Sequence, residues 1–166
     1  NRVSVELDLD DDGPMPSGWA SYLQVTMRRL ARNFPGASLG LDLTFSSDLP
    51  RAAGVSSSSA IVVGAATAFV RRGELTARDE WRAAIRDPED QATYFGCIES
   101  GHDFRTLAGN AGVGTHGGSE DHTAILACRL GHTSLYQFMP VTAVRDVAMP
   151  ADWTFVIASS GVQADK

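Results

Sequence analysis

The chain has 166 residues, of which 43% are hydrophobic and 20% are charged, and its formal net charge at pH 7 is −6. This length and apolar content suffice for one domain with one sizeable core. The acidic balance, with no extended run of Lys or Arg, argues against nucleic acid and anionic membranes as partners. No apolar run reaches the roughly 20 residues that a membrane span requires. We therefore expect a small-molecule partner and a cytoplasmic location.

Two cysteines, Cys97 and Cys128, stand in apolar surroundings and lack the spacing of metal ligands. Cysteines of this kind are typical of buried free thiols in a reducing compartment. The sequence thus predicts no disulfide and no cysteine-based metal site.

Alternation of apolar and polar residues predicts two half-buried strands in the first third of the chain, at residues 3–9 and 38–47. Between them, residues 17–34 carry apolar side chains every three or four positions, which predicts an amphipathic helix ended by Pro35 and Gly36. Its arginines, Arg28, Arg29 and Arg32, are predicted on the side away from the core.

The rest of the chain reads as further helices followed by a hairpin. A buried helix is predicted over residues 60–70, and two shorter ones begin with Thr76 as cap, paired with Asp79, and with Asp87-Pro88. Further on, a β-hairpin is predicted from residues 123–128 and 133–138, and one more strand from residues 153–158.

A glycine and four consecutive serines, Gly54 to Ser59, precede the predicted helix at residues 60–70. A helix amino terminus presents unpaired N–H groups and the positive end of the helix dipole, so phosphate is a natural ligand there. Serine hydroxyls at the same end can bind phosphate oxygens or a bridging Mg²⁺. The alternative is that one serine caps the helix and the others merely allow close packing. Because no Gly-Lys-Ser/Thr ending follows, this is not a Walker P-loop.

A second glycine-rich segment, residues 109–122, ends in Glu120, Asp121 and His122. It formally contains G-x-G-x-x-G, but no predicted strand precedes it, which argues against dinucleotide binding. A carboxylate at the end of such a loop can orient an acceptor hydroxyl and take its proton during phosphoryl transfer. Asp121 is therefore the candidate catalytic residue, and a turn carboxylate bound to nearby backbone is the alternative. His116 and His122 either contact the substrate or have backbone partners.

The two loops together resemble those of the GHMP family, the galactokinases, homoserine kinases, mevalonate kinases and phosphomevalonate kinases. The segment from Pro50 to Ala60 is similar to the family's phosphate loop, P-x-x-x-G-L-S/G-S-S-A. The segment from Gly118 to His122 resembles the G-I-M-D-Q of galactokinases, with Asp121 in register. The order of helix, serine loop and glycine-rich segment also resembles that of a galactokinase-like protein.

This resemblance implies ATP and Mg²⁺ as cofactors and a role for each motif residue. Asp121 would be the catalytic carboxylate, and Ser58 with Glu99 would ligate Mg²⁺. Gly117, Gly118 and Asp121 would contact the substrate. The residues implied to wrap the ATP phosphates are Gly54, Val55, Ser56, Ser57, Ser58 and Ser59.

The same resemblance implies the fold and the extent of the domain. The expected class is α+β, with a mixed sheet packed on helices and a left-handed β-α-β unit. Residues 1–166 would form the amino-terminal domain, incomplete at both ends, with the carboxy-terminal domain absent.

The implied activity is transfer of the γ-phosphate of ATP to a hydroxyl of a monosaccharide, galactose or a related sugar. One alternative is a non-catalytic sensor of sugar and nucleotide on the same fold. A serine hydrolase using Ser56 to Ser59 with His116 or His122 is a third interpretation, and it lacks the G-x-S-x-G nucleophile elbow.

Overall fold

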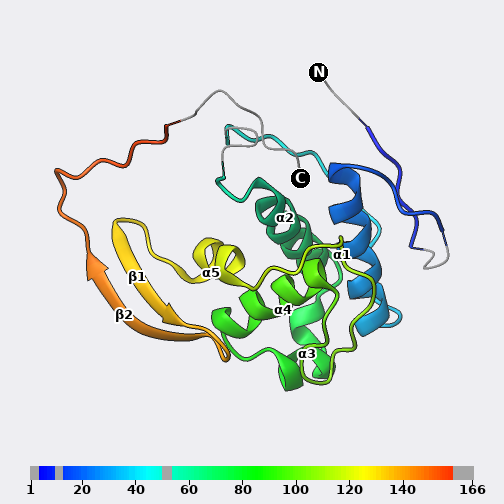
Figure 1. Cartoon of the computed structure of the whole chain (residues 1–166). Helices are drawn as coiled ribbons and strands as arrows, with labels where there is room; N and C mark the ends of the chain where they lie inside the picture. The colour runs from blue at the N-terminus through cyan, green and yellow to red at the C-terminus, as the bar shows by residue number, and fades with distance from the viewer. Residues whose placement is uncertain (1–3, 10–12, 50–53, 159–166) are drawn as a thin grey trace.

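The computed structural model describes residues 4–9, 13–49 and 54–158. Within these ranges, helices form the body of the molecule, and a β-hairpin lies to one side of it, with α5 between them in the view of Figure 1. The elements are α1 (Trp19–Asn33), α2 (Ser57–Arg72), the 3₁₀ turn η1 (Leu75–Ala77), α3 (Asp79–Ala84), α4 (Pro88–Ser100), α5 (Glu120–Ala127), β1 (His132–Gln137) and β2 (Thr142–Ala148).

Helix α1 confirms the predicted amphipathic helix. Leu23, Met27 and Leu30 are buried on it, and Phe34 is buried just past its end. Trp19, at the start of the apolar stripe, stays 39% exposed. The helix contacts both α2 and α4, so it is covered on more than one side.

The prediction that the arginines of α1 face away from the core is wrong for Arg28 and Arg29, which are both buried. Arg29 donates hydrogen bonds to Asn33 Oδ1 and to the His102 carbonyl, each at 2.7 Å. Its guanidinium lies 5.7 Å from the centroid of the Tyr94 ring. Burial lowers the pKa of Arg29 from its ordinary value. A buried guanidinium is tolerated because several acceptors and an aromatic face replace water.

The core is organised around the ring of Tyr94 on α4. Its centroid lies between 5.8 and 6.4 Å from those of four other aromatic rings. These rings belong to Phe34, Trp81, Phe95 and Phe104. They join α1, α3, α4 and the loop that follows α4, so the position of α4 is fixed from several directions.

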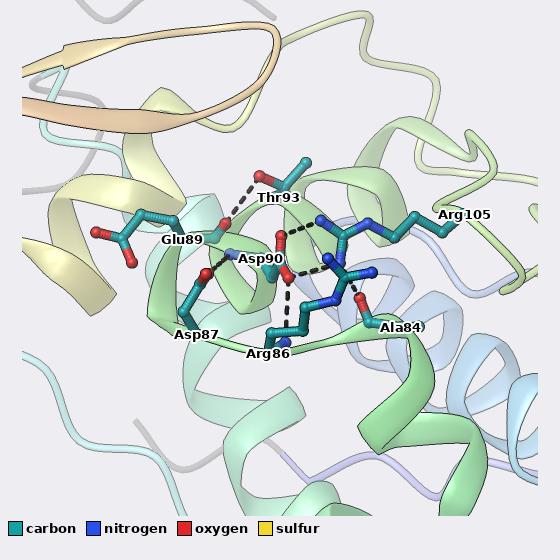
Figure 2. A network of polar contacts seen from close by, with 7 residues as sticks. All are labelled: Ala84, Arg86, Asp87, Glu89, Asp90, Thr93 and Arg105. Atoms are coloured by element: carbon teal, nitrogen blue, oxygen red, sulfur yellow. Dashed lines mark hydrogen bonds and ion pairs between the residues drawn. The ribbon is translucent and has the colours of Figure 1, made fainter.

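Helix α4 begins and ends as predicted. Asp87 caps it by accepting a hydrogen bond from the Asp90 N–H at 2.7 Å, Pro88 opens its first turn, and Gly101 ends it at φ 84°. Figure 2 shows that the carboxylate of Asp90, in the same turn, accepts hydrogen bonds from the two terminal guanidinium nitrogens of Arg105, at 2.5 and 2.6 Å. This bidentate pair holds the loop after α4 against the start of that helix.

The mixed sheet and the left-handed β-α-β unit are not found among the described residues, whose one sheet is the antiparallel pair β1-β2. Of the predicted strands, the described parts of residues 3–9, 38–47 and 153–158 make no ladder. Residues 4–9, 39–43 and 45 instead help to line a hollow of about 630 Å³ beside α1. The alternation of apolar and polar residues along a segment indicates which side chains are half-buried. A β-ladder forms only where a second strand lies beside that segment. Helices with an antiparallel hairpin still agree with the α+β class.

The predicted hairpin is wrong in its first strand, because residues 120–127 form helix α5. The second predicted strand is β1, and it pairs with β2, which the sequence analysis did not predict. A short apolar run cannot by itself distinguish a buried strand from a helix. Glu120 and Asp121 in the first turn favour the helix, because their charges complement the positive end of its dipole.

Three smaller expectations have mixed outcomes. Thr76 does not cap a helix, because it lies inside η1, and Arg78 precedes α3 without a side-chain cap. Cys97 and Cys128 are both free thiols, as predicted, but Cys128 is exposed and Cys97 only half-buried. Burial raises the pKa of the Cys97 thiol.

No described helix is long and apolar enough to cross a membrane.

Candidate active site

Three helix ends bring Ser59, Glu99 and Asp121 together. Ser59 lies in the first turn of α2, Glu99 near the last residue of α4, and Asp121 in the first turn of α5. The Ser59 hydroxyl donates to Glu99 Oε2 at 3.1 Å and lies 3.5 Å from Asp121 Oδ2. The Asp121 residue is exposed, whereas Ser59 and Glu99 are buried. A buried carboxylate and an accessible one therefore share one hydroxyl.

The amino terminus of α2 has the features of an anion site. Gly54 and Ser56 adopt left-handed backbone conformations at φ 71° and 54°, and Ser56 makes no side-chain cap. The first intrahelical bond described runs from the Ala60 N–H to the Ser56 carbonyl at 3.0 Å. N–H groups ahead of that bond have no partner within the helix and point outward with the helix dipole. Residues 50–53 of the predicted phosphate loop lie outside the described part of the chain.

Ser58, the serine expected to ligate Mg²⁺, is half-buried, and its neighbour Ser59 is the one that contacts the two carboxylates. Sequence reasoning missed Ser59 as the serine that faces Glu99. The spacing of residues along the helix could have identified Ser59, because it stands three and four positions before the buried Val62 and Val63. That spacing puts it on the core-facing stripe of α2.

Close contacts at two glycines fix the positions of α5 and of the glycine-rich segment against α4. A Cβ added at Gly96 would lie 2.9 Å from the Cβ of Ser119, the residue that precedes α5. A Cβ at Gly112 would lie 2.4 Å from the carbonyl oxygen of Glu99. The neighbouring Val113 N–H donates to that same carbonyl at 2.9 Å. The glycine-rich segment thus packs directly on the end of α4 that carries Glu99.

The other predicted loop residues lie at the surface. Gly117 and Gly118, expected to contact the substrate, are exposed just before α5, and His116 is exposed beside them. Open space surrounds the position of a Cβ on Gly117. Accessible backbone next to Asp121 is compatible with close approach of a ligand.

His122 is placed differently from His116, since its side chain is only 2% exposed. Its Nε2 lies 3.1 Å from Glu99 Oε2. The two atoms are at ion-pair distance but out of line for a hydrogen bond, and neither ring nitrogen has a hydrogen-bond partner among the described residues.

The carboxylate and hydroxyl oxygens of this site suit a hard cation, and the N–H groups at the start of α2 suit a phosphate. Carboxylate and hydroxyl oxygens are the ligands that Mg²⁺ accepts, and it commonly takes only one or two carboxylates from the protein. Within the described ranges, no group of three or more His, Cys, Asp and Glu is arranged to hold a metal ion. Among the described residues, the polar side chains that contact Glu99 are Ser59 and His122, and Ser58 is not one of them.

The serine hydrolase interpretation finds no support here. A serine nucleophile requires a base within hydrogen-bond reach, most often a histidine. The Ser59 hydroxyl instead contacts the carboxylates Glu99 and Asp121, and His122 contacts Glu99.

Residues 21–86 match the family described as GHMP kinases N terminal domain. The match covers less than half of the chain and shows that this part is similar to the GHMP kinases. It covers most of α1, the serine loop, all of α2 and α3. No curated protein and no solved structure matches the chain significantly.

The match suggests a small-molecule kinase, and proteins of that family generally use ATP and Mg²⁺. The matched residues include Ser59 but neither Glu99 nor Asp121. Those two carboxylates are associated with the serine loop by their contacts in the folded chain.

Proposed function

We propose that this chain is the catalytic amino-terminal part of an ATP-dependent sugar kinase. Its substrate would be a monosaccharide, galactose or a related sugar, as the galactokinase-like pattern at Asp121 suggests. The observation that carries the proposal is the contact of one hydroxyl, Ser59 Oγ, with both Glu99 and Asp121 at the open end of α2.

Gly54 to Ser59 would hold the ATP phosphates. Left-handed turns at Gly54 and Ser56 and the uncapped helix end supply N–H donors for phosphate oxygens. Ser58 and Glu99 would ligate Mg²⁺, and Ser59 would hold Glu99 in place through its 3.1 Å bond. Mg²⁺ bound there would neutralise charge on the phosphates during transfer.

Asp121 would act on the sugar hydroxyl that receives the phosphoryl group. Its carboxylate orients this hydroxyl and takes its proton as the oxygen attacks the γ-phosphorus. A new P–O bond forms to the sugar while the bond from the γ-phosphorus to the bridging oxygen breaks, and ADP leaves. The proton then returns from Asp121 to water. Gly117 and Gly118 would contact the sugar beside it.

A panel of free monosaccharides with ATP and Mg²⁺ tests the proposal, with ADP release from the full-length protein as the readout. We expect steady ADP release with one sugar or a small group of sugars and a phosphorylated sugar of matching mass. Nucleotide binding without turnover of any sugar would contradict the kinase and favour the sensor alternative. Turnover of a small molecule other than a sugar would contradict only the substrate class.

A further inference from the structure

His122 is a buried polar side chain that the proposed phosphoryl transfer does not use. It is among the largest fully buried side chains described and carries two ring nitrogens shielded from water. Burying polar atoms without hydrogen bonds costs free energy, so a buried and unpaired polar side chain calls for an explanation. The polar side chain that its ring contacts is Glu99.

The two contacts of the Glu99 carboxylate meet at one of its oxygens. Oε2 receives the Ser59 hydroxyl at 3.1 Å and lies 3.1 Å from His122 Nε2. Oε1 has no polar contact with any residue that the structure describes. Two contacts at Oε2 fix the orientation of the carboxylate group. Its other oxygen, Oε1, then remains available to a ligand.

The imidazole cannot easily move away from Glu99. Helix α5 is held against α4 where Ser119 packs on Gly96. The first turn of α5 is further fixed by the bond from the Thr123 N–H to the Ser119 carbonyl at 2.8 Å.

We propose that His122 is a positioning residue that orients Glu99 for a divalent cation. This inference rests on the proposed function, because it assumes that Glu99 ligates the cation that accompanies ATP. Hydrogen-bond partners of ligating carboxylates tune metal sites strongly, and their loss typically lowers metal affinity roughly 10–100-fold. His122 acts through Glu99 and needs no contact with sugar or nucleotide.

The test compares three variants of the full-length protein by Mn²⁺ binding in the presence of a non-hydrolysable ATP analogue. Electron paramagnetic resonance measures free Mn²⁺, so the readout does not depend on turnover. His122→Met has a similar volume and no N–H donor, whereas His122→Gln keeps a donor near Nε2. Thr123→Val is the matched control on the same buried face of α5, because it removes a hydroxyl that does not contact Glu99.

We expect His122→Met to weaken Mn²⁺ binding about 10-fold or more, with His122→Gln and Thr123→Val within about 3-fold of wild type. Equal Mn²⁺ affinity in wild type and folded His122→Met would overturn the role of His122 and leave the kinase proposal intact. If His122→Met does not fold, a loss of about 10-fold or more in folded His122→Gln would overturn it. Absence of analogue-dependent Mn²⁺ binding in wild type would overturn the proposed function, and this inference with it.

Discussion

Replacing Asp121 by Asn is expected to lower kcat for sugar phosphorylation by about 10²- to 10⁴-fold. Asn has the same shape but cannot accept the proton of the acceptor hydroxyl. Binding of ATP with Mg²⁺ should change little, since the proposed phosphate contacts belong to α2 and to the loop before it. Steady-state kinetics and calorimetric titration with an ATP analogue separate the two effects.

Glu120→Gln provides the matched control for Asp121→Asn. Both residues are exposed carboxylates in the first turn of α5, and the described contacts place Asp121 at Ser59. The control variant should retain kcat within a few-fold. Full activity in Asp121→Asn would show that another group takes the proton, and the assignment of the catalytic carboxylate would then be wrong.

Replacing Gly112 by Ala is expected to destabilise the fold by about 1–3 kcal/mol and to reduce sugar phosphorylation. The added methyl group would lie 2.4 Å from the Glu99 carbonyl and 2.6 Å from the Gly101 nitrogen. Both are backbone atoms, so the glycine-rich segment or the end of α4 must shift. Urea denaturation measures the loss of stability, and kinetics measures the effect of displacing Glu99.

Gly40→Ala is the control for the backbone change itself. No atom lies within 4 Å of the position of its Cβ, and Gly40 is not in a left-handed conformation. Its free energy of unfolding should stay within about 0.5 kcal/mol of wild type. A Gly112→Ala protein as stable as this control would contradict the close packing of the loop on α4.

Helices α1 and α4 were predictable because their signals are local. The apolar stripe of α1 and the sequence Asp87-Pro88 at the start of α4 need no distant partner to be recognised. The burial of Arg29 was not predictable in this way, since its acceptor, the carbonyl of His102, lies 73 positions away in the sequence. For the same reason, an alternating pattern at residues 39–45 did not reveal whether a strand lies beside it.

The candidate site was predictable in part, through motifs that resemble a known family. Asp121 and Glu99 were named from the resemblance, and the fold brings both carboxylates to one serine. The run of four consecutive serines did not reveal which of them that is. His122 followed the predicted carboxylate directly in sequence, yet its burial and its contact with Glu99 depend on how α5 packs on α4.

We propose that Ser58, Glu99 and Asp121 belong to one site for ATP, a divalent cation and the acceptor. Crystals of the full-length protein with Mn²⁺ and a non-hydrolysable ATP analogue allow the cation to be located by its anomalous scattering. We expect a peak bound by Glu99 and by Ser58 in the first turn of α2, with the γ-phosphate directed toward Asp121. A nucleotide and cation bound away from the amino terminus of α2 would contradict it.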